Sequence, residues 1–293
     1  NNEFNTYNPF NGKIIKSIPD ASENDIYKAI DSANNAFKTW SKTSPYERST
    51  YLMRAWNLMI EATDDLANTM TLEQGKPLKA SKAEIKYASD FLLCYAEEAK
   101  RINGEWLSSE KPNQKFLTLK MPVGVVGAIT PWNYPISMIT RKIAPALAAG
   151  CTIILKPSEF TPLCAIEVFK ILIKSGIPKG VINLITTSEP KKVGNIFTSD
   201  PRISKITFTG STEVGRELAS KSGKNLKRIS LELGGHAPFI VFPDSDPIHA
   251  AKGVAALKFL NSGQACISPN RIYIHKDMKE AFEKTLCERI DKI

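Results

Sequence analysis

The strongest constraint on the fold is a regular alternation of two kinds of segment between residues 123 and 232. Short apolar runs of the strand type are each followed by a segment whose apolar residues have helical spacing. The predicted strands cover residues 123–129, 152–155, 181–185, 205–208 and 229–232, and the predicted helices cover residues 139–149, 162–175, 191–198 and 212–220. This alternation is typical of right-handed βαβ units, so it predicts an α/β, Rossmann-like fold with a parallel sheet.

The flanking segments have other patterns. Residues 1–103 read as helical: Ser22 can cap a helix that runs to about Thr39, and further apolar stripes follow. In the last of these stripes the predicted inward residues are Ala80, Ala83, Tyr87, Phe91, Tyr95 and Ala99. Residues 104–122 read as two strands around a polar turn, and residues 234–293 as the start of another domain. The sequence thus predicts four parts, 1–103, 104–122, 123–233 and 234–293.

Charge and histidine content exclude several classes of function. The formal net charge is +9, but the densest basic run, residues 221–228, has no interleaved aromatic residue, which disfavours nucleic-acid binding. The three histidines lie far apart in the sequence. That spacing argues against a metal site and against a Ser-His-Asp hydrolase.

The cysteines and the hydropathy indicate the compartment. None of the five cysteines has CxxC spacing, which favours free thiols in a reducing, cytoplasmic environment. Cys94 and Cys164 lie in apolar helical stripes and Cys151 starts a buried strand, so all three read as core residues. No apolar stretch approaches the length of a membrane span, so we expect no membrane partner.

Three short segments fit one reaction between them. They are LELGG at residues 231–235, NSGQAC at residues 261–266 and PWNYP at residues 131–135. The Cys266 thiolate can add to a carbonyl, the Glu232 carboxylate can activate the water that hydrolyses the adduct, and the Asn133 amide can hold an oxyanion. Singly, each has an ordinary reading as a buried thiol, a solvated strand end or a turn residue. Together they predict an aldehyde-oxidising enzyme.

Two segments between Asn133 and Glu232 are candidates for a nucleotide site. FTGSTEVG at residues 208–215 ends a strand and opens a helix, which presents N–H groups and the helix dipole to a pyrophosphate. KPSE at residues 156–159 ends the strand of another unit, at the position where open α/β sheets bind ligands. Both segments also have an ordinary interpretation. The first lacks the full GxGxxG pattern and can be a common Gly-Ser turn, and the second can be a surface Lys-Glu pair.

As a set, these motifs resemble the NAD(P)-dependent aldehyde dehydrogenase family almost from the N-terminus to Ile293. Within the family the chain most resembles succinate-semialdehyde dehydrogenases, through MITRK at residues 138–142, ALAAGC at residues 146–151 and APFIVF at residues 237–242. The resemblance implies that Cys266 is the nucleophile, Glu232 the base and Asn133 the oxyanion residue. It also implies cofactor contacts by Ile129, Thr130, Pro131, Trp132, Lys156, Ser158, Glu159, Gly210, Ser211 and Leu233.

The resemblance carries more specific expectations about the cofactor and the substrate. A carboxylate at Glu159 accepts a hydrogen bond from a ribose 2′-hydroxyl but repels a 2′-phosphate, so we expect NAD rather than NADP. Arg141 stands where succinate-semialdehyde dehydrogenases grip the substrate carboxylate, so we expect succinate semialdehyde or a similar short carboxylate-bearing aldehyde. Leu260 and Ser268 replace an arginine and a cysteine of those relatives, which predicts weaker discrimination and no regulatory disulfide.

The resemblance also assigns roles to the four parts. Residues 1–103 and 123–233 would form the cofactor-binding domain, residues 104–122 a bridging hairpin of a homo-oligomer, and residues 234–293 the first part of the catalytic domain. Because the relatives continue well past Ile293, we expect an N-terminal fragment or a prematurely ended chain. The alternatives are an inactive nucleotide-binding fragment, a general aldehyde dehydrogenase, and an acylating dehydrogenase, which Glu232 disfavours because transfer to coenzyme A needs no base for water.

Overall fold

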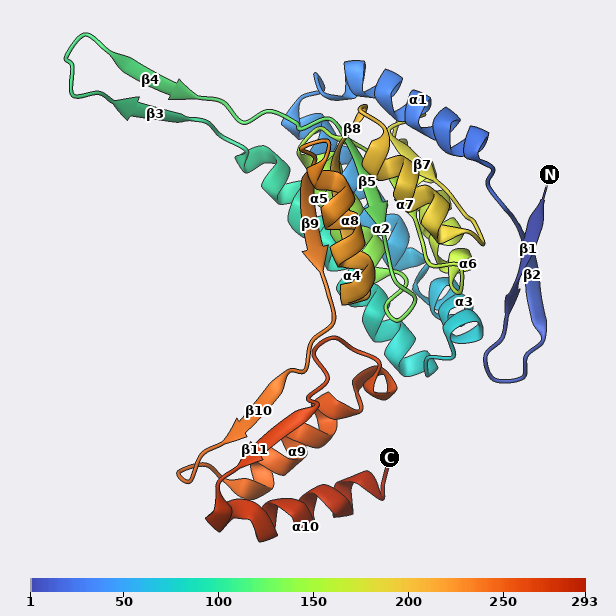
Figure 1. The fold of residues 1–293 in the computed structure, drawn as a ribbon, viewed down its shortest axis with the longest axis vertical. Helices are drawn as coiled ribbons and strands as arrows, with labels where there is room; N and C mark the ends of the chain where they lie inside the picture. The colour runs from blue at the N-terminus through green and yellow to red at the C-terminus, as the bar shows by residue number, and fades with distance from the viewer. Residues whose placement is uncertain (1) are drawn as a thin grey trace. The chain divides into compact units, whose positions relative to one another are not determined.

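The computed structural model describes residues 2–293, which divide into two compact units (Figure 1). The first unit runs to Glu232, and the second covers Leu233–Ile293. Among residues 2–293, no helix is long and apolar enough to cross a membrane. Over the same residues, no group of three or more His, Cys, Asp or Glu side chains is arranged to hold a metal ion.

A parallel sheet forms the centre of the first unit. Its strands are β5 (Val125–Ile129), β6 (Thr152–Lys156), β7 (Ile182–Leu184), β8 (Ile203–Thr209) and β9 (Arg228–Glu232), in the spatial order β7-β6-β5-β8-β9. β5 and β6 are buried along almost their whole length, as aliphatic strands covered on both faces are. The connecting helices are α5 (Ser137–Ala148), α6 (Pro162–Lys174), α7 (Pro190–Ser199) and α8 (Thr212–Gly223). The predicted α/β fold is confirmed.

Helices cover both faces of this sheet (Figure 1). On one face α5 and α6 share a core with a further helical layer, made of α2 (Pro45–Glu61), α3 (Thr63–Gln74), α4 (Leu78–Glu98) and η1 (Ala99–Arg101). On the other face α1 (Glu23–Trp40) and α7 pack against β5, β6 and β8. As predicted, Ser22 caps α1, where it forms a capping box with Asp25.

The helical reading of the N-terminal region is wrong for its first residues. β1 (Glu3–Tyr7) and β2 (Ile14–Pro19) form an antiparallel hairpin. Burial alternates along β1, where Thr6 is inside, and β2 buries Ile18, while Gly12 provides the left-handed residue of the turn at φ +68°. Because so few residues are inward and one of them is a threonine, the apolar pattern does not reveal these strands.

The predicted inward face of the helical stripe in α4 and η1 is only partly right. Ala99 is buried and Phe91 and Tyr95 pack against the core, but Ala83 and Tyr87 are exposed. The buried face carries the polar residues Ser81, Glu84 and Ser89 beside its aliphatic residues, whereas Tyr87 is 48% exposed. Cys94 is exposed for the same reason. Polar side chains can occupy this inward face because they find partners in the interior, which an apolar pattern does not reveal.

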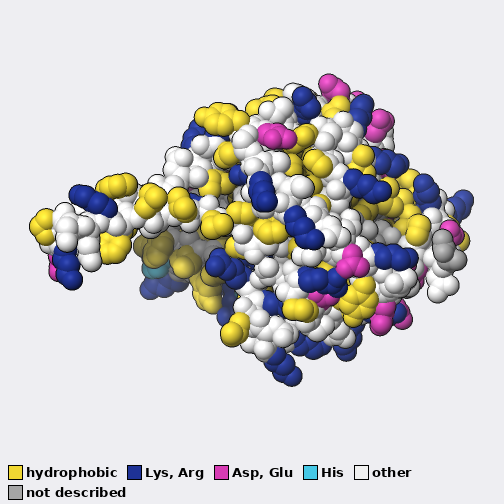
Figure 2. Space-filling model, turned by 90° about the horizontal axis from the view of Figure 1, so that it is seen from above, with side chains coloured by type: hydrophobic (Ala, Val, Ile, Leu, Met, Phe, Trp, Pro, Cys, Tyr) yellow, Lys and Arg dark blue, Asp and Glu magenta, His cyan; other side chains and the backbone are white. Residues whose placement is uncertain are grey.

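A second hairpin projects from the first unit. β3 (Glu105–Ser108) pairs with antiparallel β4 (Lys115–Thr118), so the two strands predicted within residues 104–122 are present. All residues of both strands are exposed, including Trp106 and Leu117, which are 68% and 62% exposed. Figure 2 shows hydrophobic side chains along this arm. An exposed apolar hairpin is a surface that favours association with another chain.

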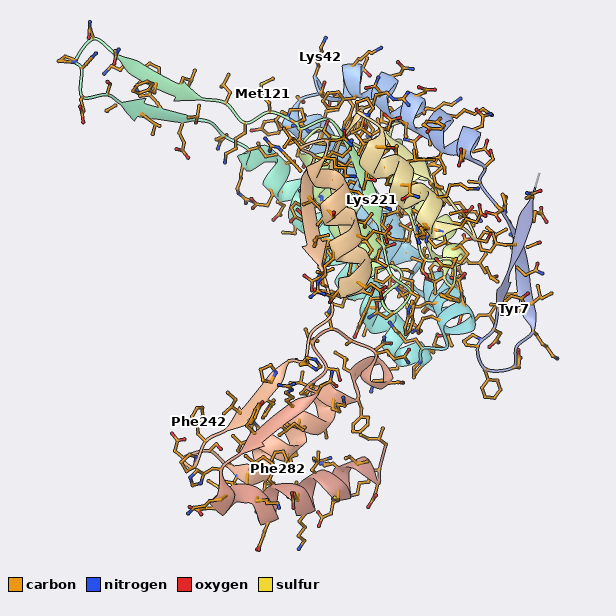
Figure 3. The ribbon with its side chains drawn as sticks, in the orientation of Figure 1. Tyr7, Lys42, Met121, Lys221, Phe242 and Phe282 are labelled. Atoms are coloured by element: carbon orange, nitrogen blue, oxygen red, sulfur yellow. The ribbon has the colours of Figure 1, made fainter. Side chains whose placement is uncertain are left out.

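The second unit has a small core of its own. Its elements are β10 (Pro238–Val241), α9 (Pro247–Lys258), η2 (Leu260–Gly263), β11 (Arg271–Ile274), η3 (Lys276–Met278) and α10 (Lys279–Ile290). β10 and β11 pair in parallel. Phe282 of α10, labelled in Figure 3, is 1% exposed and packs in one cluster with Val241, Ala251 and Val254. This cluster joins both α-helices of the unit to β10.

Glu73 caps a helix from outside that helix. α6 has no side-chain N-cap of its own, and the Glu73 carboxylate at the end of α3 accepts the backbone N–H groups of Leu163 (2.7 Å) and Cys164 (2.9 Å). Burial raises the pKa of Glu73 to about 7, although these hydrogen bonds oppose the shift. The cap therefore carries a carboxyl group that titrates near neutral pH.

The raised pKa of Glu73 predicts a pH-dependent stability. Between pH 4.5 and about 7 the folded chain holds a proton that the unfolded chain has lost, so the free energy of unfolding falls as pH rises through this window. The fall is at most about 1.4 kcal/mol per pH unit, and Glu73→Gln removes it. Urea denaturation at pH 5, 6, 7 and 8, followed by tryptophan fluorescence, measures both proteins. Parallel pH profiles for wild type and variant would show that Glu73 does not titrate there.

Candidate active site

The predicted site residues of the first unit lie along one edge of its sheet. Since the strands are parallel and Ile129 pairs with both Lys156 and Phe208, the carboxyl ends of β5, β6 and β8 are level. Glu232, paired with Thr209, ends β9 at the same edge, and Leu233 follows it. The chain proceeds from β5 outward to β7 and then crosses back to β8, so the order of strands reverses between β5 and β8. Open α/β sheets bind ligands at such a point.

The loop after β5 carries Pro131, Trp132 and Asn133. Trp132 is 40% exposed, so its ring is available to a ligand. The Oδ1 atom of Asn133 accepts the N–H of Tyr134 (3.1 Å). An amide side chain also carries two N–H donors, and such donors are what an oxyanion requires.

Two buried side chains of the helical layer hold this loop, and neither was predicted. Lys76 Nζ donates to the carbonyl oxygen of Asn133 (3.1 Å) and forms an ion pair with Glu84. Glu84 Oε1 accepts the backbone N–H groups of Ile136 and Ser137, each at 3.1 Å. Their partners lie 52 or more residues further along the chain, so local sequence patterns give no signal for them.

Arg141 lies on α5 against an aromatic pair of α4. Its Nη2 atom donates to the hydroxyl of Tyr87 (2.6 Å), and its guanidinium carbon lies 5.1 Å from the centre of the Phe91 ring. The rings of Tyr87 and Phe91 meet edge to face at 5.0 Å. The exposed Tyr87 thus orients an arginine, since a planar guanidinium both stacks on rings and donates in fixed directions.

A cavity of about 380 Å³ has walls from α5, β8 and β9. Its lining includes four cationic side chains: Arg141, Lys142, Lys205 and Arg228. No Asp or Glu of the described residues is among the lining. Burial lowers the pKa of Lys142 to about 8, and its Nζ donates to Thr207 Oγ1 (3.0 Å). A concave basic surface of this kind attracts anions.

The segment after β6 contains a partly buried ion pair. Lys156 Nζ and Glu159 Oε2 are 2.8 Å apart, and the two side chains are 3% and 29% exposed. Burial lowers the pKa of Lys156, and the Glu159 carboxylate partly opposes this shift. Ser158 is buried, and its hydroxyl accepts the N–H of Phe160 (3.3 Å). The charge of Glu159 is therefore largely balanced within the protein.

Hydroxyl groups and a helix terminus flank the point where the strand order reverses. The Oγ1 atoms of Thr130 and Thr209 are buried and have no hydrogen-bond partner among the described residues. Ser211 caps α8 by accepting the N–H of Val214 (3.3 Å). A Cβ on Gly210 would lie 2.4 Å from the ring of Phe208, so this glycine is also required by packing. Unpaired buried hydroxyls beside a helix N-terminus fit the polar groups of a dinucleotide.

Cys266 lies in the second unit, on an exposed loop. The loop follows Asn261, Ser262 and Gly263, whose φ angles are 52°, 57° and 77°. Left-handed conformations at two non-glycine residues cost energy and are concentrated at functional loops. A Cβ on Gly235 would lie 3.5 Å from the carbonyl oxygen of Cys266, so the structure brings these two predicted motifs together within the unit.

Burial distinguishes Cys266 from two of the other thiols. Cys151 and Cys164 are buried, and burial raises the pKa of both. Because the thiolate is the nucleophile, these two are unsuited to attack at neutral pH. Cys94 and Cys287 are exposed like Cys266, but they lie on the helices α4 and α10 rather than on a loop with left-handed residues.

Comparisons with known proteins give one result throughout. A sequence model described as "Aldehyde dehydrogenase family" matches residues 1–293. The chain is 46% identical over 286 residues to succinate-semialdehyde dehydrogenase (NADP(+)) of Escherichia coli strain K12, and the match covers 98% of this chain and 59% of that relative. Glutarate-semialdehyde dehydrogenase of Pseudomonas aeruginosa shows the same identity and coverage. The crystal structure of an E. coli NADP dependent enzyme matches with a TM-score of 0.98 at 45% identity, covering 100% of this chain and 60% of that one. The chain thus spans about three fifths of the length of these relatives.

The expected preference for NAD over NADP is wrong. Relatives from E. coli, Schizosaccharomyces pombe and Saccharomyces cerevisiae, 44–46% identical to the chain, are all named as NADP(+) enzymes. A Glu159 carboxylate without a partner would repel the 2′-phosphate of NADP. In the structure Lys156 pairs with it at 2.8 Å, so the repulsion is weakened by a cation at the same place.

Proposed function

The chain belongs to the aldehyde dehydrogenase family, and on that premise we propose that the whole protein oxidises an aldehyde to a carboxylic acid with NADP. The observation that carries the proposal is the family match over residues 1–293, a stretch that includes Asn133, Glu232 and Cys266. The placement of Asn133 and Glu232 at the carboxyl edge of the sheet, and of Cys266 on an exposed loop, supports their assigned roles.

The proposed reaction proceeds through a covalent adduct on Cys266. The thiolate adds to the aldehyde carbon, and the Asn133 amide donates to the oxyanion that forms. NADP, when bound, supplies the acceptor for the hydride that leaves this carbon. Glu232 then takes a proton from water, which attacks the resulting thioester and releases the acid and the Cys266 thiolate. A base for water favours hydrolysis over transfer of the acyl group to coenzyme A.

Residues at the edge of the sheet would hold the cofactor. The proposed contacts are Ile129, Thr130, Pro131, Trp132, Lys156, Ser158, Glu159, Gly210, Ser211 and Leu233. Two features support them: the unpaired hydroxyls of Thr130 and Thr209, and the capped N-terminus of α8 beside Gly210. Lys156 contributes positive charge near the Glu159 carboxylate. The pairing offsets the Glu159 charge, so the additional phosphate that distinguishes NADP from NAD meets less repulsion there.

For the substrate we propose a short aldehyde with a terminal carboxylate, such as succinate semialdehyde. Arg141 provides a guanidinium that the Tyr87 hydroxyl holds through a hydrogen bond of 2.6 Å. Relatives at 46% identity are named for succinate and for glutarate semialdehyde, which share this chemistry. A general aldehyde dehydrogenase is the alternative. The exposed apolar hairpin β3–β4 supports assembly as a homo-oligomer within the same proposal.

Substrate preference tests this proposal. In the whole encoded protein, kcat/KM with NADP should be higher for succinate semialdehyde than for butanal. Arg141→Ala should reduce the ratio of the two kcat/KM values by about 10- to 150-fold, because that factor corresponds to the free energy of one charge-assisted hydrogen bond. Tyr87→Phe should remove a smaller part, because the guanidinium keeps its charge and loses one orienting bond. Arg54→Ala, at an exposed position on α2, is the matched control.

The possible outcomes separate the alternatives. Equal kcat/KM values for both aldehydes in wild type, with Arg141→Ala unchanged, would leave a general aldehyde dehydrogenase. NADP binding by fluorescence titration without any turnover would instead favour an inactive nucleotide-binding fragment.

A further inference from the structure

A buried ion pair connects the helical layer to the loop that carries Asn133. The side chains of Lys76 and Glu84 are 1% and 2% exposed. Lys76 stands between Gly75, the left-handed C-cap of α3, and Pro77, the N-cap of α4, so its backbone is restricted on both sides. Ion pairs are costly to bury unless their remaining hydrogen-bonding groups are satisfied.

The further bonds of this pair all reach one short segment. Lys76 donates to the carbonyl oxygen of Asn133, and its Nζ lies 4.2 Å from the centre of the Tyr134 ring. Glu84 accepts the N–H groups of Ile136 and Ser137 at the start of α5, a helix without a side-chain cap of its own. The pair therefore binds the backbone on both sides of Pro135.

We propose that Lys76 and Glu84 are positioning residues, which direct the Asn133 amide toward the oxyanion by fixing the backbone of residues 133–137. The proposal rests on the function proposed for Asn133. The carbonyl that Lys76 binds belongs to Asn133 itself, so loss of the Lys76 ammonium group removes one restraint on the orientation of the Asn133–Tyr134 peptide plane. Misplacement of a catalytic group by about 1 Å costs as much as 10²-fold in rate.

A purely structural role is the competing explanation, and Glu73 provides the matched control for it. Glu73 also caps a helix from outside, is also buried, and also binds two backbone N–H groups, but these lie at the start of α6. If helix capping alone matters, Glu73→Gln and Glu84→Gln should have similar consequences. If positioning matters, only Glu84→Gln should affect catalysis beyond its effect on stability.

The test compares Lys76→Met, Lys76→Arg, Glu84→Gln and Glu73→Gln in the whole encoded protein. Lys76→Met and Glu84→Gln should lower kcat about 10- to 100-fold while the Kd for NADP changes less than about threefold. Lys76→Arg should recover part of kcat because it keeps the charge and a donor. Glu73→Gln should shift Tm without lowering kcat. Equal losses of kcat in Glu73→Gln and Glu84→Gln would overturn the proposal.

Two further measurements strengthen the test. A double-mutant cycle separates positioning from a general loss of stability, and hydrogen exchange gives a readout that does not depend on the proposed reaction. In an Asn133→Ala background, Lys76→Met should lower kcat no further, because its effect passes through Asn133; a fully additive loss would contradict this. Backbone amide exchange of Tyr134 and of residues 136–138 should accelerate in Lys76→Met but not in Glu73→Gln. A wild-type protein that does not oxidise aldehydes would refute the proposed function. Unchanged amide exchange in Lys76→Met would refute the positioning role, whether or not the protein oxidises aldehydes.

Discussion

Cys266→Ala should lower kcat for aldehyde oxidation by about 10⁴-fold or more, because no other group can form the thioester. Binding of NADP should stay within about threefold of wild type, since the thiol acts on the aldehyde. Steady-state NADPH formation measures kcat, and fluorescence titration measures the Kd of the cofactor. In wild type, an added aldehyde should protect Cys266 from alkylation by a thiol reagent. In Cys266→Ala no aldehyde-protected alkylation should remain.

Cys287→Ala and Cys94→Ala are the controls for this experiment. Both thiols are exposed, as Cys266 is, so they share its access to reagents but lie on helices. Both variants should retain full activity. A Cys266→Ala protein with undiminished turnover, or a loss as large in Cys287→Ala, would refute the assignment of the nucleophile.

Glu232→Gln should separate the two halves of the reaction. Hydride transfer needs no base for water, so the first turnover should still give a burst of about one NADPH per active site, followed by a steady-state rate about 10²- to 10⁴-fold lower. Rapid-mixing absorbance at 340 nm measures both phases, and acid quenching followed by mass spectrometry detects the acyl group on Cys266.

The matched control is Glu61→Gln, which removes an exposed carboxylate from the end of α2. It should leave burst and steady state unchanged. Loss of the burst in Glu232→Gln with preserved steady turnover would show that Glu232 acts before hydride transfer, and the proposed role would be wrong.

The central fold could be predicted from the sequence because its signals are local. The strands between Val123 and Glu232 are short aliphatic runs, as β5 and β6 are, or carry apolar residues at intervals, as β8 and β9 do, and each helix has its own apolar period. This alternation of segments implies a parallel sheet. The hairpin of residues 3–19 was missed because two short strands with few buried residues give a weak alternation. The exposure of Cys94 and the full inward face of α4 could not be predicted, because the charged residue Glu84 is buried with partners from another element.

The site was predictable only where chemistry and motif coincide in a few neighbouring residues. Asn133, Glu232 and Cys266 stand in short distinctive segments, and they remain predictions for experiment. Lys76 stands in an ordinary helix connection and Glu84 within α4, and their importance arises only from contacts across the fold. The cofactor preference could not be predicted for a similar reason. The Glu159 carboxylate alone would repel a 2′-phosphate, but the local electrostatic potential depends on the ion pair that Glu159 forms with Lys156.

Helix α4 has a consequence for how such a protein can change over generations. Along one side it presents Glu84 to the start of α5 and, one and two turns later, Tyr87 and Phe91 to Arg141. In the proposed function the first contact bears on rate and the other two on the choice of aldehyde, and they are made by separate side chains of one helix. Substitution of Tyr87 or Phe91 should therefore change the preferred aldehyde while Glu84, and with it the turnover rate, is kept, so a new specificity can evolve from residues that do not themselves react.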